Sequence, residues 1–466
     1  MIFASTRAAF KQERVYNRAF DLAVNVLLAL GKRTITGILS AGGKQFHDWS
    51  AAYRLFLKGR INQQKFFAPA ILNVMENQPA DTPLFVMMDD TLLRKCGRKV
   101  AGTSWKRDPL GPKFTTNFVW GQRFLQISAA LPDHDVDGRA RGIPIDFRHA
   151  PSPVKPRKNA GLEVWCEYRK QQKLCRISMA GATCLAELRE QIPGEKIVCS
   201  VDGGYTNETV FTAIPDNMVI IGRIRKDAKL YRVPEEYIGK SRGRKKYYGE
   251  PLPTPEQIRQ DDKYLWEKIS AFAAGKKHAF EVKSVASVRW KSSKNQDMRI
   301  VIIRPLAYRP RKNSKLLYRD PAYLICSDPQ LPLEQVVQAY IWRWEIELNF
   351  RDEKTIMGVG EAQVRNPLTV QSVPAFIVAC YSYLLLADHA NKTDSSIIPS
   401  PKWYKRKSSD RCSTQKILSI FRSQIWGIEL GNNKSGFVSN ISKSPQTRSR
   451  FFPSISLKSA ICYNTK

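Results

Sequence analysis

Apolar residues in the first 80 positions recur at the three- and four-residue spacing of a helix that is buried on one side, for example at Phe20, Leu22 and Val26. Short apolar segments on both sides of a glycine turn at residues 41–43 continue this pattern. We therefore predict a helical domain over residues 1–80. Two short helices around a turn are the plan of a DNA-binding helix-turn-helix, and an ordinary helical bundle fits the same pattern.

After position 83 the pattern changes to continuous apolar runs, which are typical of strands buried on both faces. Residues 84–88 form one such run, and it ends in Asp89-Asp90-Thr91. Residues 196–201 form a second run, and it ends in Asp202. Both runs therefore predict core strands that carry a carboxylate where they end.

The sequence predicts further elements between and after these two strands. They are a hairpin of residues 113–119 and 124–130 around Trp120-Gly121-Gln122, a polar loop over 131–160, a helix over 165–190 and a strand over 218–224. This order of strand, hairpin, helix, strand and strand predicts an α/β fold with an RNase H-like mixed β-sheet core.

Residues 222–320 interrupt this order with basic, turn-rich segments of alternating polarity, including the basic run at 241–248, and we interpret them as a β-rich insertion. The core then resumes with a predicted strand over 321–327, a long helix over 333–357 and an apolar helix over 373–387. The predicted domains are a helical DNA-binding domain (1–80), a catalytic core in two parts (81–221 and 321–390), the insertion (222–320) and a basic C-terminal tail or small domain (391–466).

The net charge of the chain is extreme. Its 75 Lys and Arg residues outnumber 42 Asp and Glu residues, which leaves a formal net charge of +33 over 466 residues. Such an excess favours a polyanionic partner, and double-stranded DNA is the partner we expect. The basic residues of the predicted helix-turn-helix are Lys32, Arg33, Lys44, Arg54, Lys58 and Arg60.

Several classes of protein find no support in the sequence. The longest apolar stretches, 22–30 and 376–387, are shorter than the ~20 residues of a membrane span, so we expect no membrane partner. The N-terminal residues lack the apolar core of a signal peptide. The nine cysteines form no CxxC pair, which argues against a zinc ribbon and suits reduced thiols in a cytoplasm.

Three acidic residues are candidates for metal ligands because of their positions. Asp90 and Asp202 each end a predicted core strand, and Glu347 lies on the helix that follows the last strand. Carboxylates gathered at a sheet edge repel one another unless they share protons or bind a cation. Oxygen ligands without a neighbouring His or Cys select Mg²⁺ or Mn²⁺ over zinc.

The helix around Glu347 carries a second pattern. Tyr340, Arg343, Glu347 and Lys354 fall within an arc of about 60° on a regular helix, and Arg351 lies on the same stripe. A carboxylate flanked by these side chains suits a metal ligand beside groups that hold phosphates. A helix face with ordinary ion pairs is the alternative.

These residues resemble a known family. The segment 340–354 matches the Y-x2-R-x3-E-x6-K signature of the DDE transposases of bacterial insertion sequences in all its spacings. The segments around Asp90-Thr91 and Asp202-Gly203 are similar to the first and second Asp motifs of that family, and the resemblance covers roughly residues 80–370. This class also carries a β-rich insertion before the last motif.

The resemblance implies that Asp90, Asp202 and Glu347 bind two Mg²⁺ (or Mn²⁺) ions and catalyse cleavage. The family places the first Asp directly before Thr or Ser, which favours Asp90 over Asp89, whereas alternation along the strand does not decide between them because both faces are apolar. Tyr340, Arg343, Lys354 and Arg351 would then bind the phosphates of the transposon end.

The function implied is that of a cut-and-paste DNA transposase, which nicks the inverted-repeat ends of a transposon and joins their 3′-hydroxyls to target DNA. We expect a homodimer on the DNA, in the bacterial cytoplasm and associated with the nucleoid. Two alternatives stay open, namely a non-catalytic DNA-binding protein derived from a transposase and a metal-dependent nuclease without strand transfer.

Overall fold

The computed structural model describes residues 2–108, 111–112, 114–133, 135–234, 246–309, 313–391 and 411–430. Most of the basic run at 241–248 and most of the predicted C-terminal tail lie outside these residues. The chain divides into two compact units, which are described one at a time. Unit 1 comprises Met1–Asn73, Lys95–Ala101 and Phe350–Lys466, and unit 2 comprises Val74–Arg94 and Gly102–Asn349.

Unit 1 is helical, as the sequence predicts for its N-terminal part. Its elements are η1 (Ile2–Ala9), α1 (Glu13–Leu28), α2 (Ile35–Ala41), α3 (Ser50–Leu57), most of α4 (Gln63–Glu76), α11 (Pro367–Asn391) and α12 (Thr414–Leu430). Aromatic side chains fill its core. The rings of Phe66 and Phe376 stack with 5.4 Å between their centroids, and the hydroxyl of Tyr383 donates a hydrogen bond to the carbonyl of Phe66.

The predicted helix-turn-helix segment contains both expected helices, α2 and α3, but one of its basic residues is not free to contact DNA. The Arg33 side chain is buried and donates hydrogen bonds to the carbonyls of Val26 and Ala29 near the end of α1. Lys32, by contrast, is exposed. Arg33 therefore ties the C-terminus of α1 to the following turn, which corrects its predicted place on a DNA-binding surface.

The helix α11 extends beyond both ends of the apolar helix predicted over 373–387. It is the one described helix that is long and apolar enough to cross a membrane, and 83% of its most apolar window is buried inside the structure. The core helix of a soluble protein passes the same test of length and hydropathy.

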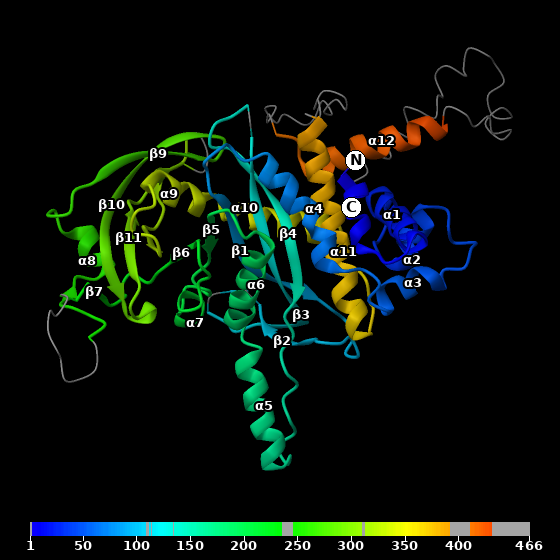
Figure 1. The fold of residues 1–466 in the computed structure, drawn as a ribbon, viewed down its shortest axis with the longest axis horizontal. Helices are drawn as coiled ribbons and strands as arrows, with labels where there is room; N and C mark the ends of the chain where they lie inside the picture. The colour runs from blue at the N-terminus through cyan, green and yellow to red at the C-terminus, as the bar shows by residue number, and fades with distance from the viewer. Residues whose placement is uncertain are drawn as a thin grey trace. The chain divides into compact units, whose positions relative to one another are not determined.

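Unit 2 is built on a large mixed sheet, shown in Figure 1. Its core strands run in the order β4-β3-β1-β5-β6, in which β1, β5 and β6 are parallel and β3 and β4 are antiparallel to their neighbours. The strands are β1 (Leu84–Arg94), β3 (Phe118–Pro132), β4 (Ala140–His149), β5 (Ile197–Val201) and β6 (Met218–Arg223), and β2 (Ser104–Arg107) pairs with β3. This order confirms the predicted RNase H-like α/β fold.

The predicted β-rich insertion is also confirmed, and it extends the same sheet. Beyond β6 the strand order continues β14-β11-β10-β7-β8, and β9 pairs with β10. The elements are β7 (Leu230–Arg232), β8 (Pro251–Leu252), α8 (Pro255–Gln260), β9 (Glu267–Ala273), β10 (Lys276–Trp290), η2 (Lys291–Ser293), β11 (Asp297–Ile303) and β14 (Ala322–Cys326), and β12 (Ala307–Tyr308) and β13 (Leu317–Tyr318) form a separate pair.

The predicted hairpin around Trp120-Gly121-Gln122 is wrong. These residues lie inside β3, and the hairpin is formed by β3 and β4 instead, so the predicted loop over 131–160 contains a strand. Gly121 pairs with Arg94 of β1, and an added Cβ there would lie 2.6 Å from the carbonyl oxygen of Leu93. The glycine therefore permits a close approach of two strands, and it does not form a turn.

Two predicted helices are each divided in the structure. The helix predicted over 165–190 is α5 (Leu162–Leu174) followed by α6 (Ile177–Gln191), and a short helix α7 (Glu208–Phe211) follows β5. The long helix predicted over 333–357 is α9 (Leu333–Trp342) followed by α10 (Trp344–Thr355), with a turn at Arg343. The predicted single regular helix is therefore interrupted at Arg343, and the stripe of residues on one helix face is continuous only within α10.

Candidate active site

The strand β1 carries two adjacent carboxylates whose side chains have different partners. Asp90 accepts a hydrogen bond of 2.9 Å from the hydroxyl of the buried Tyr205, and its other carboxylate oxygen lies 3.2 Å from Nε of Arg123 on β3. Asp89 lies 3.6 Å from the guanidinium of Arg343. Consecutive residues of a strand face opposite sides of the sheet, which explains this division.

The register of the sheet brings Asp89 next to Asp202. Parallel strands β1 and β5 pair from Leu84 with Ile197 to Met88 with Val201. The next position in this register aligns Asp89 with Asp202, which follows β5 directly. Residues at matched positions of neighbouring strands face the same side, so these two acids share one face of the sheet.

Glu347 lies on α10, and neighbouring residues fix that helix against the sheet. Asn349 accepts a hydrogen bond from Ser128 of β3 and donates one to the carbonyl of Gly142 of β4, and Glu345 accepts one from the Gly142 amide. At about 100° per residue, Glu347 lies on the other side of the helix from Glu345 and Asn349. Contact with β3 and β4 therefore leaves Glu347 available for a different partner.

That partner is Arg343, which joins two of the acids. One guanidinium nitrogen lies 3.0 Å from Glu347, and the other lies 3.6 Å from Asp89. The Arg343 side chain is only 11% exposed and Asp89 is 20% exposed, so the contact with Asp89 is the more desolvated of the two; Glu347 is 35% exposed. A single cation thus lies between a carboxylate of β1 and a carboxylate of α10.

The charge of Asp202 affects the pKa values of both Asp89 and Glu347. Burial raises the pKa of Asp89 to about 7, and the charges of Asp90 and Asp202 add to the shift while Arg343 opposes it. Burial also raises the pKa of Glu347, again with Arg343 opposing and Asp202 adding to the shift. The charge of Asp202 therefore acts on both Asp89 and Glu347, as expected for carboxylates that approach one another with little positive charge between them.

The chemistry of these donors suits a hard divalent cation, although the conformation described is not a closed metal site. Among the described residues, no group of three or more His, Cys, Asp and Glu side chains lies close enough to hold a metal ion. Carboxylate oxygens are the ligands that Mg²⁺ and Mn²⁺ prefer. Arg343 provides the positive charge between Asp89 and Glu347 in this conformation.

The other predicted phosphate-binding residues lie on the same two helices. Tyr340 is half-buried on the last turns of α9 in unit 2. Arg351 and Lys354 lie on the part of α10 that belongs to unit 1, where Arg351 pairs with Asp352 at 2.9 Å and the ammonium of Lys354 lies 5.8 Å from the centre of the Phe350 ring. Their approach to a phosphate stays a prediction.

Sequence reasoning missed Tyr205 and Arg123, and it ranked Asp89 below Asp90. Tyr205 follows the second Asp motif by three residues, and its depth in the core is the only signal that distinguishes it from a loop tyrosine. Burial, together with the charge of Asp90, raises the pKa of Tyr205 well above its usual value. Its hydroxyl is therefore a permanent hydrogen-bond donor to Asp90 at neutral pH.

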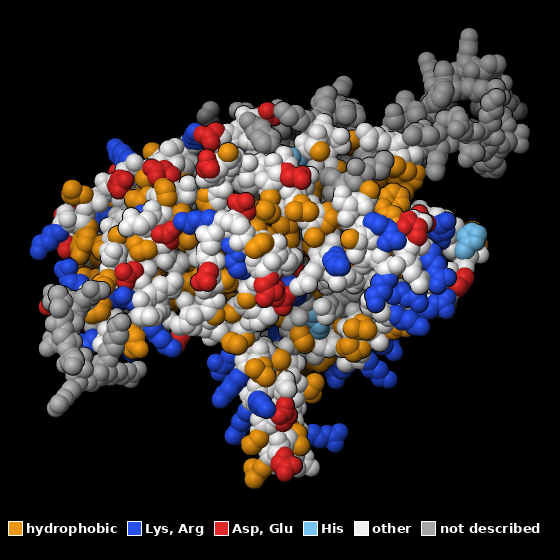
Figure 2. Space-filling view, viewed as in Figure 1, with side chains coloured by type: hydrophobic (Ala, Val, Ile, Leu, Met, Phe, Trp, Pro, Cys, Tyr) orange, Lys and Arg blue, Asp and Glu red, His pale blue; other side chains and the backbone are white. Residues whose placement is uncertain are grey.

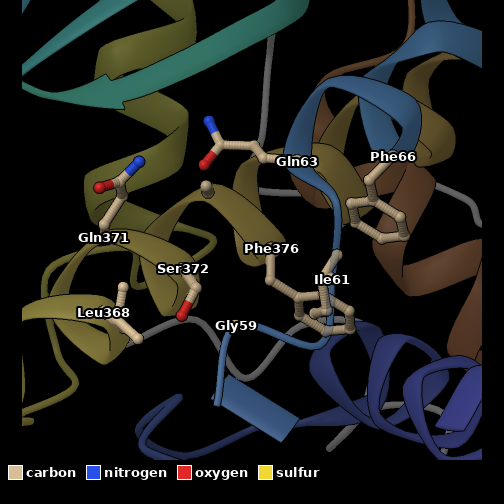
Figure 3. A pocket seen from close by; sticks show the side chains of 9 residues that line it. Gly59, Ile61, Gln63, Phe66, Leu368, Gln371, Ser372 and Phe376 are labelled. Atoms are coloured by element: carbon tan, nitrogen blue, oxygen red, sulfur yellow. The ribbon is translucent and has the colours of Figure 1, made fainter. Parts of the chain in front are cut away.

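Unit 1 contains a pocket that is separate from the candidate active-site residues. Figure 3 shows its lining, in which the side chains of Gln63 and Gln371 lie near apolar residues such as Phe376. None of the predicted site residues lines it.

The comparison with protein families gives the class. Residues 13–295 match the family model described as DDE superfamily endonuclease, which is more than half of the chain, and the chain belongs to this family. The match includes Asp89, Asp90 and Asp202 and ends before the segment 340–354, so the signature in that segment stays a prediction. No curated protein matches the chain. Enzymes of this class act on DNA and generally use divalent metal ions.

Proposed function

We propose that this chain is a DNA transposase, which cuts phosphodiester bonds at transposon ends and transfers the 3′-hydroxyl ends into target DNA. The observation that carries the proposal is the pairing of Arg343 with both Asp89 and Glu347, beside Asp202 at the matched position of the neighbouring strand, on an RNase H-like sheet. Membership of the DDE superfamily endonucleases supports the cleavage step. The transfer step rests on the signature at residues 340–354.

The metal ligands in this proposal are Asp202, Glu347 and one aspartate of β1. The motif before Thr91 predicts Asp90 in the sequence. The register with Asp202 and the contact with Arg343 favour Asp89 instead, because Asp90 is already held by Tyr205 and Arg123. Asp90 would then be a positioning residue that orients β1 through its own two contacts.

These residues would hold two Mg²⁺ or Mn²⁺ ions, and such ions activate the attacking oxygen and stabilise the leaving oxygen of a displacement at phosphorus. Arg343 would move from the carboxylates to a DNA phosphate when the cations take over its role of charge neutralisation. Tyr340, Arg351 and Lys354 would hold neighbouring phosphates. No covalent intermediate with the protein is required, so one site serves both cutting and joining.

The positive charge of the chain would hold the DNA backbone. Figure 2 shows Lys and Arg side chains gathered over the region of α1–α3, and the exposed residues there include Lys32, Lys44, Arg54 and Lys58. Binding through such residues releases counterions and weakens steeply with salt. Two ends must be held together for transfer, so we propose a homodimer on DNA in the bacterial cytoplasm, associated with the nucleoid.

The test is a cleavage and strand-transfer assay with DNA that carries the inverted repeats flanking the gene. Wild-type protein with Mg²⁺ or Mn²⁺ should nick this DNA and form joined products, and Glu347→Gln should bind the same DNA without nicking it. Nicking without joined products would indicate a nuclease. Binding without nicking by the wild type would indicate a non-catalytic DNA-binding protein.

A further inference from the structure

The helix α5 projects from unit 2 and does not pack into its core. Figure 1 shows it extending away from α6 and the strands. None of the 13 residues in Leu162–Leu174 is buried, although the helix contains Trp165. Isolated helices of this length are marginal in water. A helix that gains so little from its own fold is better explained by a contact with another molecule.

The charge of the segment indicates what that molecule is. Residues 155–176, from the preceding loop through α5, contain seven basic and two acidic side chains. All seven basic side chains are exposed, and none makes an ion pair with a described residue. They are Lys155, Arg157, Lys158, Arg169, Lys170, Lys173 and Arg176. Figure 2 shows Lys and Arg side chains on the part of the surface where Figure 1 places α5.

The basic residues of the helix itself share one face. At about 100° per residue, Arg169, Lys170 and Lys173 fall within an arc of about 100°, and Glu163 and Glu167 lie outside it. The exposed thiol of Cys166 lies within the same arc. An α-helix fits the major groove of B-DNA, and Lys and Arg on one face can reach the phosphates on the groove walls.

We infer that α5 is a DNA-binding helix whose basic face, Arg169, Lys170 and Lys173, contacts the phosphates of double-stranded DNA. The inference rests on the proposed function only in taking DNA as the ligand. The occupant is DNA and not an acidic protein because the ligand must complement several unpaired cations along an extended helix. Exposed apolar residues at the helix ends, Leu162 and Leu174, make a second protein copy the competing occupant.

The first experiment measures the affinity for a duplex of about three helical turns, roughly 30 base pairs, as a function of salt concentration. The variant is Arg169→Gln/Lys170→Gln/Lys173→Gln. It should bind about tenfold or more weakly, and the slope of log affinity against log salt should become shallower by about 2 to 3, since each phosphate contact contributes close to one. Its melting temperature should equal that of the wild type, because the three side chains hold nothing in place.

The matched control removes three exposed lysines of the insertion, Lys263, Lys268 and Lys276, and so changes the net charge equally. The affinity of this control for the duplex, and the slope of its log affinity against log salt, should be closer to the wild-type values than those of the α5 variant. An equal loss in both variants would overturn the inference, because the effect would then be one of total charge.

The second experiment uses the exposed Cys166 of the wild-type protein. Its alkylation, followed by mass spectrometry, should slow several-fold when the duplex is added, and it should not slow in the α5 variant. Unchanged alkylation with DNA bound would overturn the inference. A variant that binds DNA normally but elutes from size-exclusion chromatography as a smaller species than the wild type would also overturn it, because α5 would then be a subunit interface. A wild type that is protected at Cys166 but never cuts DNA would refute the proposed transposase and leave this inference intact.

Discussion

Asp89, in the middle of β1, and Asp202, directly after the end of β5, occupy matched positions of two neighbouring parallel strands, one step beyond the pairing of Met88 with Val201. A carboxylate pair in this arrangement repels itself, and the raised pKa of Asp89 reflects burial together with that repulsion. The relationship depends on register alone. Substitution of each β1 aspartate in turn therefore tests which of the two is the metal ligand of the proposed site.

We predict that Asp89→Asn abolishes metal-dependent cleavage, whereas Asp90→Asn reduces it about ten- to hundredfold. In the proposed site the first change would remove a metal ligand. The second would remove only a positioning contact, and loss of such a contact around a metal site typically costs about ten- to hundredfold. The measurement is single-turnover cleavage, with Mg²⁺ affinity followed by titration calorimetry. The reverse order of effects would return the role of ligand to Asp90.

We predict that Arg343→Gln lowers the free energy of unfolding by about 2 kcal/mol in the absence of metal, because Asp89 and Glu347 lose the cation between them. Added Mg²⁺ should then raise the melting temperature of this variant more than that of the wild type. The control is Arg225→Gln, because the Arg225 side chain is 84% exposed, pairs with the exposed Asp227 and should contribute little to stability. An unchanged melting temperature in Arg343→Gln would show that the acids do not need this cation.

We predict that Gly121→Ala destabilises unit 2 by about 1 to 3 kcal/mol, because the new methyl group meets the backbone of β1. Gly194→Ala is the control, since an added Cβ there meets no atom within 4 Å. Chemical denaturation measures both variants. Equal stability of the two would mean that β1 and β3 are not paired as described.

We predict an acid-dependent loss of stability from His149. Burial lowers the pKa of this imidazole, which lies against the ring of Phe124, to about 4. Between that value and the ordinary pKa of about 6.5, the unfolded state binds a proton that the folded state does not, so stability falls as the pH falls. The loss should reach about 3 kcal/mol near pH 4.

The measurement is the free energy of unfolding at pH 7 and pH 5, for the wild type and for His149→Phe. The variant should lose less stability on acidification. His47, which is exposed, supplies the control through His47→Phe, and this variant should follow the wild type. A His149→Phe variant as acid-sensitive as the wild type would contradict the prediction.

The core strands were predictable because a strand buried on both faces is a continuous apolar run, and residues 84–88 and 196–201 are such runs. The strand β4 was not, because its sequence is interrupted by a proline and stands beside a polar loop. Pro144 is accommodated where the pairing with β3 shifts between Ile127 and Ser128. A bulge of this kind tolerates proline but leaves no mark in a local pattern.

The candidate site divides in the same way. Asp202 lies at the strand end that the apolar run before it predicts, and Glu347 follows from the spacing around it. The prediction that the first strand ends at Asp89-Asp90 is wrong, because β1 continues to Arg94 through its pairing with β3. The choice between Asp89 and Asp90 depends on strand register, which involves residues more than a hundred positions away. The contact between Tyr205 and Asp90 has the same origin, since the depth of a tyrosine in a core is a property of packing.

The strand β14 lies between the core strand β6 and the insertion strand β11, with hydrogen bonds to both. The insertion is therefore an integral part of the sheet and cannot be removed as a separate domain. Excising it from the gene would strip β14 of one neighbour and convert an interior strand into an open edge, the kind of surface on which other chains polymerise. Shortened versions of the enzyme should for this reason precipitate before they lose their fold.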